Sequence, residues 1–226
     1  MGPMEVHVNL TREYALRTPC KVVFVDYRLA PENPFPIGFL DCYNALLWTY
    51  NNAVELGIDR RRIAVAGDSA GGNLAAAVAQ MGRDKNGPSI CFQLLCYPVT
   101  DRRMNSKSMK EFKDTPFWDS QYNEKMWEIY LKNGHKGMLQ YTSPMEAESF
   151  RNLPDGYVEV AEFDPLRDEG KEYAESLIKG GSKVYLNETK GTIHGYDTVI
   201  DSTITQNNIN KRIEILREVF GKLSDK

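Results

Sequence analysis

Residues 62 to 71 read Arg-Ile-Ala-Val-Ala-Gly-Asp-Ser-Ala-Gly, and this stretch decides the fold. Arg62 to Gly67 predicts a buried strand, and the small residues from Asn73 to Met81 predict a helix directly after it. Ser69 therefore lies in a tight strand–turn–helix connection, where Gly67 and Gly71 leave room for the backbone. Such a turn projects a serine hydroxyl clear of the sheet, as a nucleophile requires. The alternative is an N-cap serine in a glycine-rich turn.

The same alternation of strand and helix continues on both sides of this motif. Further helices are expected at about residues 40 to 57, at Arg167 to Lys179 before Gly180-Gly181, and at Thr203 to Phe220. Alternating strands and helices predict an α/β fold with right-handed crossovers and a mostly parallel sheet. The other expected strands are Lys21–Asp26, Ile90–Pro98, Gly156–Phe163 and Lys183–Asn187.

One long segment interrupts this alternation. Thr100 to Asn152 separates two expected strands by far more residues than a crossover needs. It is charged and rich in large aromatic residues, which favours a cap or lid over a site. The alternative is a helical decoration whose aromatic residues pack on the body of the domain.

Composition bounds the class of protein. The chain has 226 residues, 42% of them hydrophobic and 26% charged, which predicts one globular domain spanning residues 1–226. A net charge of −3 gives no electrostatic basis for binding nucleic acid or anionic lipid. No apolar run is long enough to span a membrane, and no secretory signal is visible near the first residues. Four cysteines without metal-ligand spacing predict reduced thiols and a cytoplasmic location: Cys20, Cys42, Cys91 and Cys96.

A serine nucleophile needs a base, and the chain has three histidines. His7 and His135 are expected to be solvated surface groups. His194 follows the last expected strand by seven residues, in a loop at the carboxyl edge of the sheet. Ser69 must emerge at the same edge, because parallel strands all end on one side. His194 is therefore the candidate base.

An acidic residue should orient the imidazole and stabilise its charged form. Asp164 directly follows the expected strand Gly156–Phe163, in an exit loop next to that of His194. Glu162 lies inside the strand end, and Asp168 and Glu169 fall in the following helix. Asp164 is therefore the candidate, although it is also suited to cap the helix that follows Pro165. The order Ser69, Asp164, His194 is the chain order of α/β-hydrolases.

Four stretches of the chain resemble the hormone-sensitive-lipase-like branch of the α/β-hydrolases, the bacterial acetyl esterases and carboxylesterases. They are Val25-Asp-Tyr-Arg-Leu-Ala-Pro-Glu32, Gly67-Asp-Ser-Ala-Gly-Gly-Asn73, Asp164-Pro-Leu-Arg-Asp-Glu169 and His194-Gly195. The resemblance implies that Ser69 is the nucleophile, His194 the base and Asp164 its partner. It also implies cleavage of short-chain carboxylic esters, without metal or cofactor, under a cap formed by the segment 100–152.

The chain departs from this family near its start. Members carry a strand ending in a His-Gly-Gly-Gly loop, and this motif is absent from the sequence. Met1 to Thr18 matches only the helix that follows the loop. Ala70 is then the one recognisable oxyanion-hole donor, and loss of a donor lowers turnover by about 10²–10³. Activity is therefore expected to be weak.

The missing strand would lie between Lys21–Asp26 and Arg62–Gly67, and its loss leaves a gap of about 9.5 Å in the sheet. Two outcomes are open: Lys21–Asp26 pairs directly with Arg62–Gly67, which gives five strands in sequential order, or another chain covers the edge and forms a homo-oligomer.

Two functions follow from these patterns. The first is a serine hydrolase that cleaves small esters through an acyl-enzyme. The second is a catalytically impaired hydrolase-fold remnant that acts as a binding or oligomer-forming module. Nucleotide binding is not supported, because the glycines match neither a dinucleotide fingerprint nor a P-loop.

Overall fold

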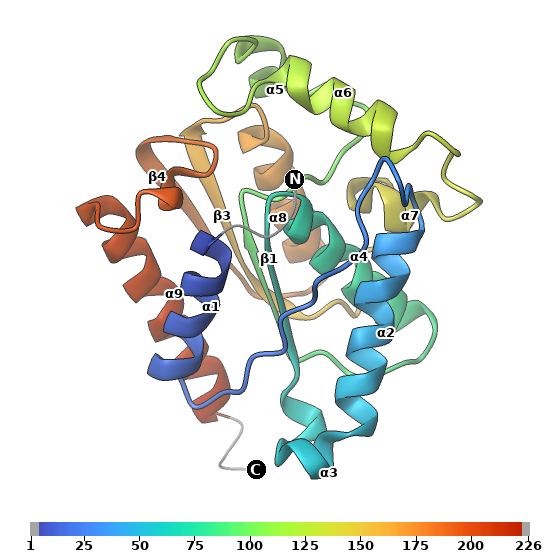
Figure 1. Cartoon of the computed structure of the whole chain (residues 1–226), viewed down its shortest axis with the longest axis vertical. Coiled ribbons are helices and arrows are strands. Elements are labelled where there is room, and N and C mark those ends of the chain that lie inside the picture. The colour runs from blue at the N-terminus through green and yellow to red at the C-terminus, as the bar shows by residue number, and fades with distance from the viewer. Residues whose placement is uncertain (1–4, 223–226) are drawn as a thin grey trace.

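The computed structural model describes residues 5–222, which form a parallel sheet with helices on both faces (Figure 1). The sheet has four strands in the order β1-β2-β3-β4, and each pairs in parallel with the next. Because all the strands run parallel, their carboxyl ends lie at one edge of the sheet. The strands are β1 (Ala64–Asp68), β2 (Phe92–Cys96), β3 (Asp155–Phe163) and β4 (Val184–Ile193).

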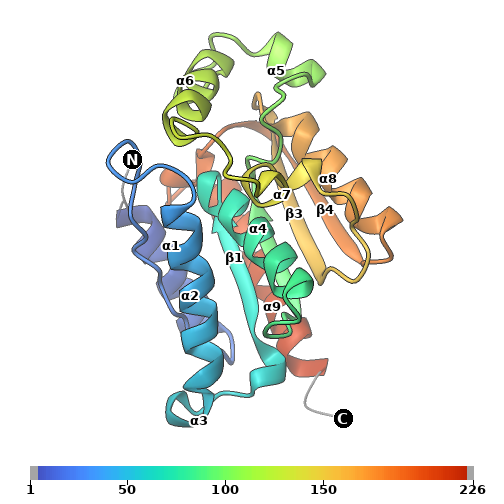
Figure 2. The same cartoon turned by 90° about the vertical axis from the view of Figure 1, so that its right-hand side faces the viewer.

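Two apolar layers enclose the sheet, since successive side chains of a strand point to opposite faces. On one face, Leu95 and Val158 pack against α4 (Ala70–Asp84) and α8 (Arg167–Lys179). On the other face, Leu94, Cys96 and Tyr157 pack against the last helix. The remaining long helices are α1 (Glu5–Arg17), α2 (Ile37–Asn51) and α9 (Thr203–Lys222); α2 covers α4, and α1 packs beside α9 (Figure 2).

The expected strand Lys21–Asp26 is the main correction. Residues 19–29 form no strand, and Val22, Val23 and Phe24 are 39%, 42% and 45% exposed. A strand needs a hydrogen-bonding partner along its edge. In the described part of the chain this segment does not pair with β1, so the first of the two open outcomes, a five-stranded sheet, is wrong. β1 forms one edge of the sheet.

The other expected elements are present with adjusted ends. The helix at 167–179 has the predicted bounds, whereas α4 extends beyond Asn73–Met81 in both directions. β4 runs on to Ile193 rather than ending at Asn187, since its pairing with β3 continues past an irregularity between Ala161 and Phe163. Two short helical segments lie between α2 and β1, α3 (Ala53–Leu56) and the 3₁₀ turn Arg60–Arg62. Within residues 5–222, no helix has the length and apolar character needed to cross a membrane.

The segment from 100 to 152 lies over the carboxyl edge of the sheet (Figures 1 and 2). It contains α5 (Lys107–Glu111), α6 (Ser120–Tyr130), α7 (Leu139–Thr142) and the 3₁₀ turn Pro144–Glu146. Ser108 of α5 anchors it on α8: its hydroxyl donates to Pro165 O at 2.8 Å and accepts from Asp168 N at 3.0 Å. The segment is thus tied to the loop that carries Asp164.

Candidate active site

Ser69 occupies the turn between β1 and α4 in a strained backbone conformation. Its φ of 55° lies in the left-handed region, which costs a non-glycine residue about 1–3 kcal/mol. Hydrogen bonds to the neighbouring strand hold this conformation: Ser69 N donates to Cys96 O at 2.9 Å, and Val99 N donates to Ser69 O at 3.2 Å. The loop after β2 therefore fixes the position from which the Ser69 hydroxyl projects.

Two glycines permit this turn, and only one of them, Gly67, is a glycine that the motif predicts to be necessary. A Cβ on Gly67 would lie 2.1 Å from Gly71 O, and a Cβ on Gly72 would lie 2.8 Å from the Cβ of Pro98. A Cβ on Gly71 would meet nothing within 4 Å. The prediction is therefore right for Gly67 and wrong for Gly71, and it missed Gly72, where helix α4 passes close to the segment after β2.

His194 stands directly after β4 and faces the serine. Its Nε2 is 2.9 Å from Ser69 Oγ, and its side chain is 4% exposed. The expected gap of seven residues after the strand is wrong, because β4 extends to Ile193. The expected placement at the carboxyl edge is nevertheless what the structure has.

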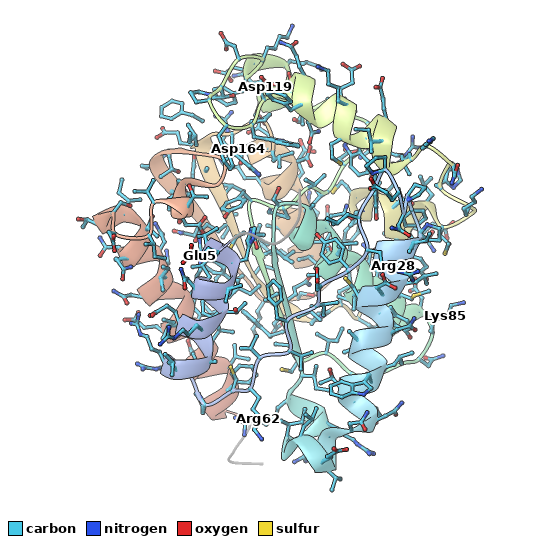
Figure 3. The ribbon with its side chains drawn as sticks, viewed as in Figure 1. Glu5, Arg28, Arg62, Lys85, Asp119 and Asp164 are labelled. Atoms are coloured by element: carbon cyan, nitrogen blue, oxygen red, sulfur yellow. The ribbon has the colours of Figure 1, made fainter. Side chains whose placement is uncertain are left out.

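Asp164 completes the chain of hydrogen bonds. Its Oδ2 is 2.8 Å from His194 Nδ1, and its side chain is fully buried. In the tautomer in which Nδ1 donates to Asp164, Nε2 is free to accept from the Ser69 hydroxyl. The Asp164 Oδ1 also accepts from Leu166 N at 2.9 Å, so Asp164 supports the start of α8 as well. Figure 3 shows Asp164 at the upper end of the sheet, below Asp119 of the overlying segment.

The competing carboxylates have hydrogen-bond partners other than the imidazole. Glu162 accepts from Gly191 N at 2.8 Å, and this bond lowers the pKa of Glu162. Asp168 binds Ser108 N at 2.8 Å. Glu169 Oε1 accepts from the backbone N–H groups of residues 100 and 101, and burial raises the pKa of Glu169 well above its usual value.

The other two histidines have different surroundings. His135 is exposed, as expected. His7 is not the solvated group that was predicted: it is partly buried on α1, and its Nε2 is 3.1 Å from Asp68 Oδ2. Helix α1 therefore reaches the residue that precedes Ser69.

Two aromatic residues lie against His194: Trp118, one of the aromatic residues expected in a lid over the site, and Tyr97, which the sequence patterns did not single out. The Tyr97 ring meets the imidazole edge-on, with centroids 4.8 Å apart, and the Trp118 ring lies 5.8 Å away. Tyr97 directly follows β2, so the rule that located Asp164 after β3 would also have found it. Trp118 comes from the overlying segment, whose fold no local pattern determines.

Ala70 is the first residue of α4. The first N–H groups of a helix have no partner within it, and the helix dipole favours negative charge there. The Ala70 N–H therefore lies beside Ser69 at the positive end of a 15-residue helix.

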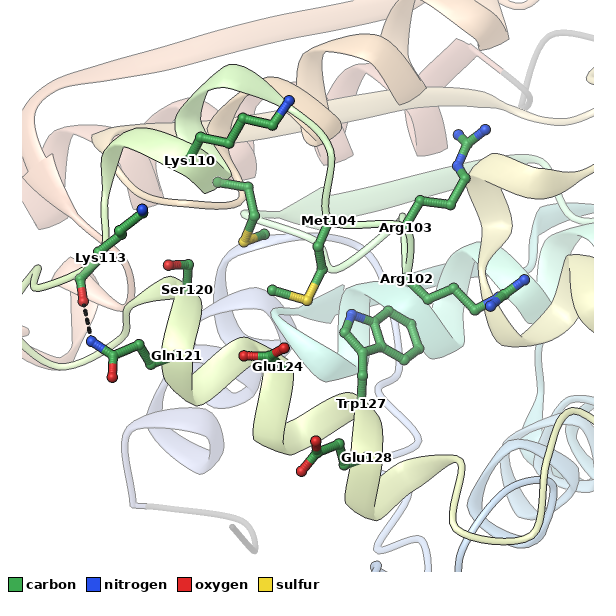
Figure 4. Close-up of a pocket in the computed structure, with 11 residues that line it drawn as sticks. Arg102, Arg103, Met104, Lys110, Lys113, Ser120, Gln121, Glu124, Trp127 and Glu128 are labelled. Atoms are coloured by element: carbon green, nitrogen blue, oxygen red, sulfur yellow. Dashed lines mark hydrogen bonds between the residues drawn. The ribbon is translucent and has the colours of Figure 1, made fainter.

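A separate cleft opens in the overlying segment (Figure 4). It has a volume of about 620 Å³ and lies between α5, α6 and residues 102–104. Its lining does not include Ser69, Asp164 or His194. Two of its cations are paired, Arg102 with Glu146 and Arg103 with Asp101. Across the described residues, no group of three or more histidine, cysteine or acidic side chains is placed to hold a metal ion.

Comparison with known proteins assigns the family. The model of a family described as alpha/beta hydrolase fold matches residues 1–198. A carboxylesterase of Mycobacterium tuberculosis is 41% identical over 200 residues, which cover 87% of this chain and 62% of the relative. An arylesterase of Saccharolobus solfataricus is 36% identical over 97% of this chain and 71% of the relative. The chain thus spans about three fifths of the carboxylesterase's length.

Solved structures agree with this assignment. An esterase of Mycobacterium marinum superposes with a TM-score of 0.89 at 37% identity, covering 93% of this chain and 67% of that one. A thermostable esterase from Pseudomonas putida gives 0.90 at 32% identity, with 96% and 69% covered. The resemblance seen in the sequence motifs is confirmed, and the chain belongs to the alpha/beta hydrolase fold family.

Proposed function

We propose that this chain is a carboxylic ester hydrolase in which Ser69 is the nucleophile, His194 the general base and Asp164 the residue that orients the imidazole. The observation that carries the proposal is the continuous pair of hydrogen bonds, 2.9 Å from Ser69 Oγ to His194 Nε2 and 2.8 Å from His194 Nδ1 to Asp164 Oδ2. Relatives named carboxylesterase, arylesterase and esterase support the substrate class.

The proposed reaction follows from these contacts. Ser69 Oγ attacks the ester carbonyl carbon while His194 Nε2 takes the hydroxyl proton. The tetrahedral oxyanion then collapses, its C–O bond to the alcohol breaks, and Nε2–H protonates the departing alkoxide. Water attacks the resulting acyl-serine by the same proton transfer and releases the acid. Asp164, buried against Nδ1, stabilises the imidazolium in both steps.

The oxyanion would form next to the start of α4. We assign the Ala70 N–H as one donor to it, because the helix N-terminus favours developing negative charge. One preorganised donor typically contributes about 10²–10³ in turnover. Removing this donor would therefore slow turnover by about the same factor.

Residues 100–152 would act as a cap on this site. Trp118 lies over the His194 ring, and the Phe117 ring is so close that a Cβ on Gly195 would be 2.6 Å from it. Both aromatic residues come from the segment between α5 and α6. Their place next to the base supports a role in shaping the pocket for small, short-chain acyl groups.

The test is hydrolysis of p-nitrophenyl acetate by the full chain and by two serine variants. Ser69→Ala should abolish turnover, whereas Ser149→Ala, at an exposed serine outside the proposed triad, should leave it unchanged. Equal activity of Ser69→Ala and the parent chain would contradict the assignment of the nucleophile.

One observation favours a second function, a module that forms oligomers. β1 is an edge of the sheet, and the extended segment beside it exposes Val22, Val23 and Phe24. An uncovered edge is a template for pairing with another chain. Sedimentation over a range of concentrations tests this: self-association supports a homo-oligomer, and a monodisperse monomer contradicts it.

A cytoplasmic location remains a prediction that rests on the four cysteines, all free thiols.

A further inference from the structure

A buried ionic cluster lies behind the loop that carries His194, and the reaction above does not use it. Arg212 of α9 is 1% exposed and faces two carboxylates, Glu159 of β3 and Asp197, which are 0% and 2% exposed. A buried guanidinium is costly to desolvate unless its donors are paired. Arg212 donates to both oxygens of Glu159, to Asp197 Oδ2 at 3.0 Å and to the Tyr196 hydroxyl at 3.2 Å.

These contacts fix the chain immediately after His194. Tyr196 and Asp197 belong to the 3₁₀ turn Tyr196–Thr198, which follows the left-handed Gly195. The Tyr196 hydroxyl also donates to Glu159 Oε1 at 2.7 Å. The Tyr196 and Asp197 side chains, two and three residues beyond His194, are thus tied to Arg212.

Tyr97 carries the cluster to the imidazole itself. Its hydroxyl donates to Asp197 Oδ1 at 2.5 Å, while its ring meets His194 edge-on at 4.8 Å. Burial, and then the charge of Asp197, raise the pKa of Tyr97, so its hydroxyl stays protonated as a donor. Asp197 therefore receives Tyr97 on one oxygen and Arg212 on the other.

We propose that Arg212 is a positioning residue for His194, which it holds in reach of Ser69 by fixing Asp197 and, through Asp197, the Tyr97 ring. The proposal rests on the proposed ester hydrolysis and names a determinant outside the three residues that touch the reacting atoms. Arg212 also lies outside residues 1–198, which the family model matches.

The geometry gives this positioning a clear purpose. Tyr97 follows Cys96, whose carbonyl holds the Ser69 amide, so one short segment touches both the nucleophile and the base. A displacement of about 1 Å in such a site can lower the rate by about 10². Loss of the bond between Tyr97 and Asp197 would free the ring that packs on His194.

The test uses the rate at which a fluorophosphonate labels Ser69, since labelling requires an activated serine but not full turnover. Tyr97→Phe removes only the hydrogen bond to Asp197. Asp197→Asn replaces one accepting oxygen by an NH₂ group, which cannot accept from Tyr97 or from Arg212. Both should slow labelling about tenfold, and Arg212→Lys should do likewise because an ammonium does not reproduce the fork of a guanidinium.

Tyr157→Phe is the matched control. Tyr157 also donates to Glu159 in the same cluster and is fully buried, but its partners are Glu159 and Asn187 rather than His194. It should lower the melting temperature as Tyr97→Phe does, yet leave the labelling rate within about twofold. If Tyr157→Phe slowed the labelling of Ser69 as much as Tyr97→Phe does, the cluster would have only a structural role and the proposal would be overturned.

The double variant sharpens the route. If Arg212 acts through Tyr97, Arg212→Lys should add little to the slowing caused by Tyr97→Phe, and fully multiplicative slowing would contradict the route. Should Arg212→Lys fail to fold, Tyr97→Phe and Asp197→Asn still decide. If the parent chain is not labelled at Ser69, the proposed hydrolase function fails; if it is labelled and Tyr97→Phe labels at the parent rate, only the positioning role fails.

Discussion

The two sides of this sheet contrast sharply. At the carboxyl edge, residues 125 positions apart in the chain meet within hydrogen-bond distance, as Ser69 and His194 do. At the β1 edge, the apolar run Lys21–Asp26 remains an unpaired extended segment. Parallel topology alone brings the ends of all strands together, whereas a strand also needs a neighbour to pair with. An apolar pattern is thus not sufficient for a strand.

The largest expected effect comes from removing the proposed general base, His194, at the carboxyl edge. His194→Ala should lower kcat/KM for p-nitrophenyl acetate by about 10⁴–10⁶, because the serine then has no proton acceptor. His135→Ala, at an exposed histidine, should leave kcat/KM unchanged. A similar loss in both variants would mean that His194 is not the base.

The next effect compares the stability of alanine variants at two glycines of the turn around Ser69, Gly67 and Gly71. Gly67→Ala would place a Cβ 2.1 Å from Gly71 O, so the turn must shift, at a cost of about 3 kcal/mol of unfolding free energy. Gly71→Ala meets open space and should change stability by no more than about 1 kcal/mol, in the stabilising direction. Urea unfolding of both variants measures the difference, and equal destabilisation would contradict the turn geometry.

A matched pair of valines compares the two sides directly. Val158→Ala in the buried β3 should lower the free energy of unfolding by about 2 kcal/mol. Val23→Ala, at a residue 42% exposed, should lower it by less than about 0.5 kcal/mol. Chemical denaturation gives both values, and a large loss at Val23 would show that the segment is covered or paired in solution.

The smallest effect concerns Glu169, which holds residues 100 and 101 from α8. Because burial raises its pKa in the folded chain, folding favours the protonated acid. This stability is fully present below the ordinary pKa near 4.5 and is lost as the pH rises toward the folded value. Glu169→Gln should therefore flatten the decline in melting temperature between pH 5 and 8. An unchanged slope would contradict a protonated Glu169.

The fold class and the three site residues were within reach of the sequence, since strand ends and chain order sufficed to select Asp164 over Glu162, Asp168 and Glu169. What escaped it depends on tertiary contacts. Gly71 looked necessary until the path of α4 past Pro98 showed that Gly72 is the crowded position. His7 looked solvated because nothing local predicts that α1 lies beside Asp68.

The central claim is that Ser69 is the activated nucleophile of a carboxyl-edge site. Labelling the full chain with a fluorophosphonate, followed by mass spectrometry of its peptides, tests it most directly. We predict a single adduct on the peptide that contains Ser69, absent in Ser69→Ala and greatly slowed in His194→Ala. An adduct on another residue, or labelling that persists in Ser69→Ala, would contradict it.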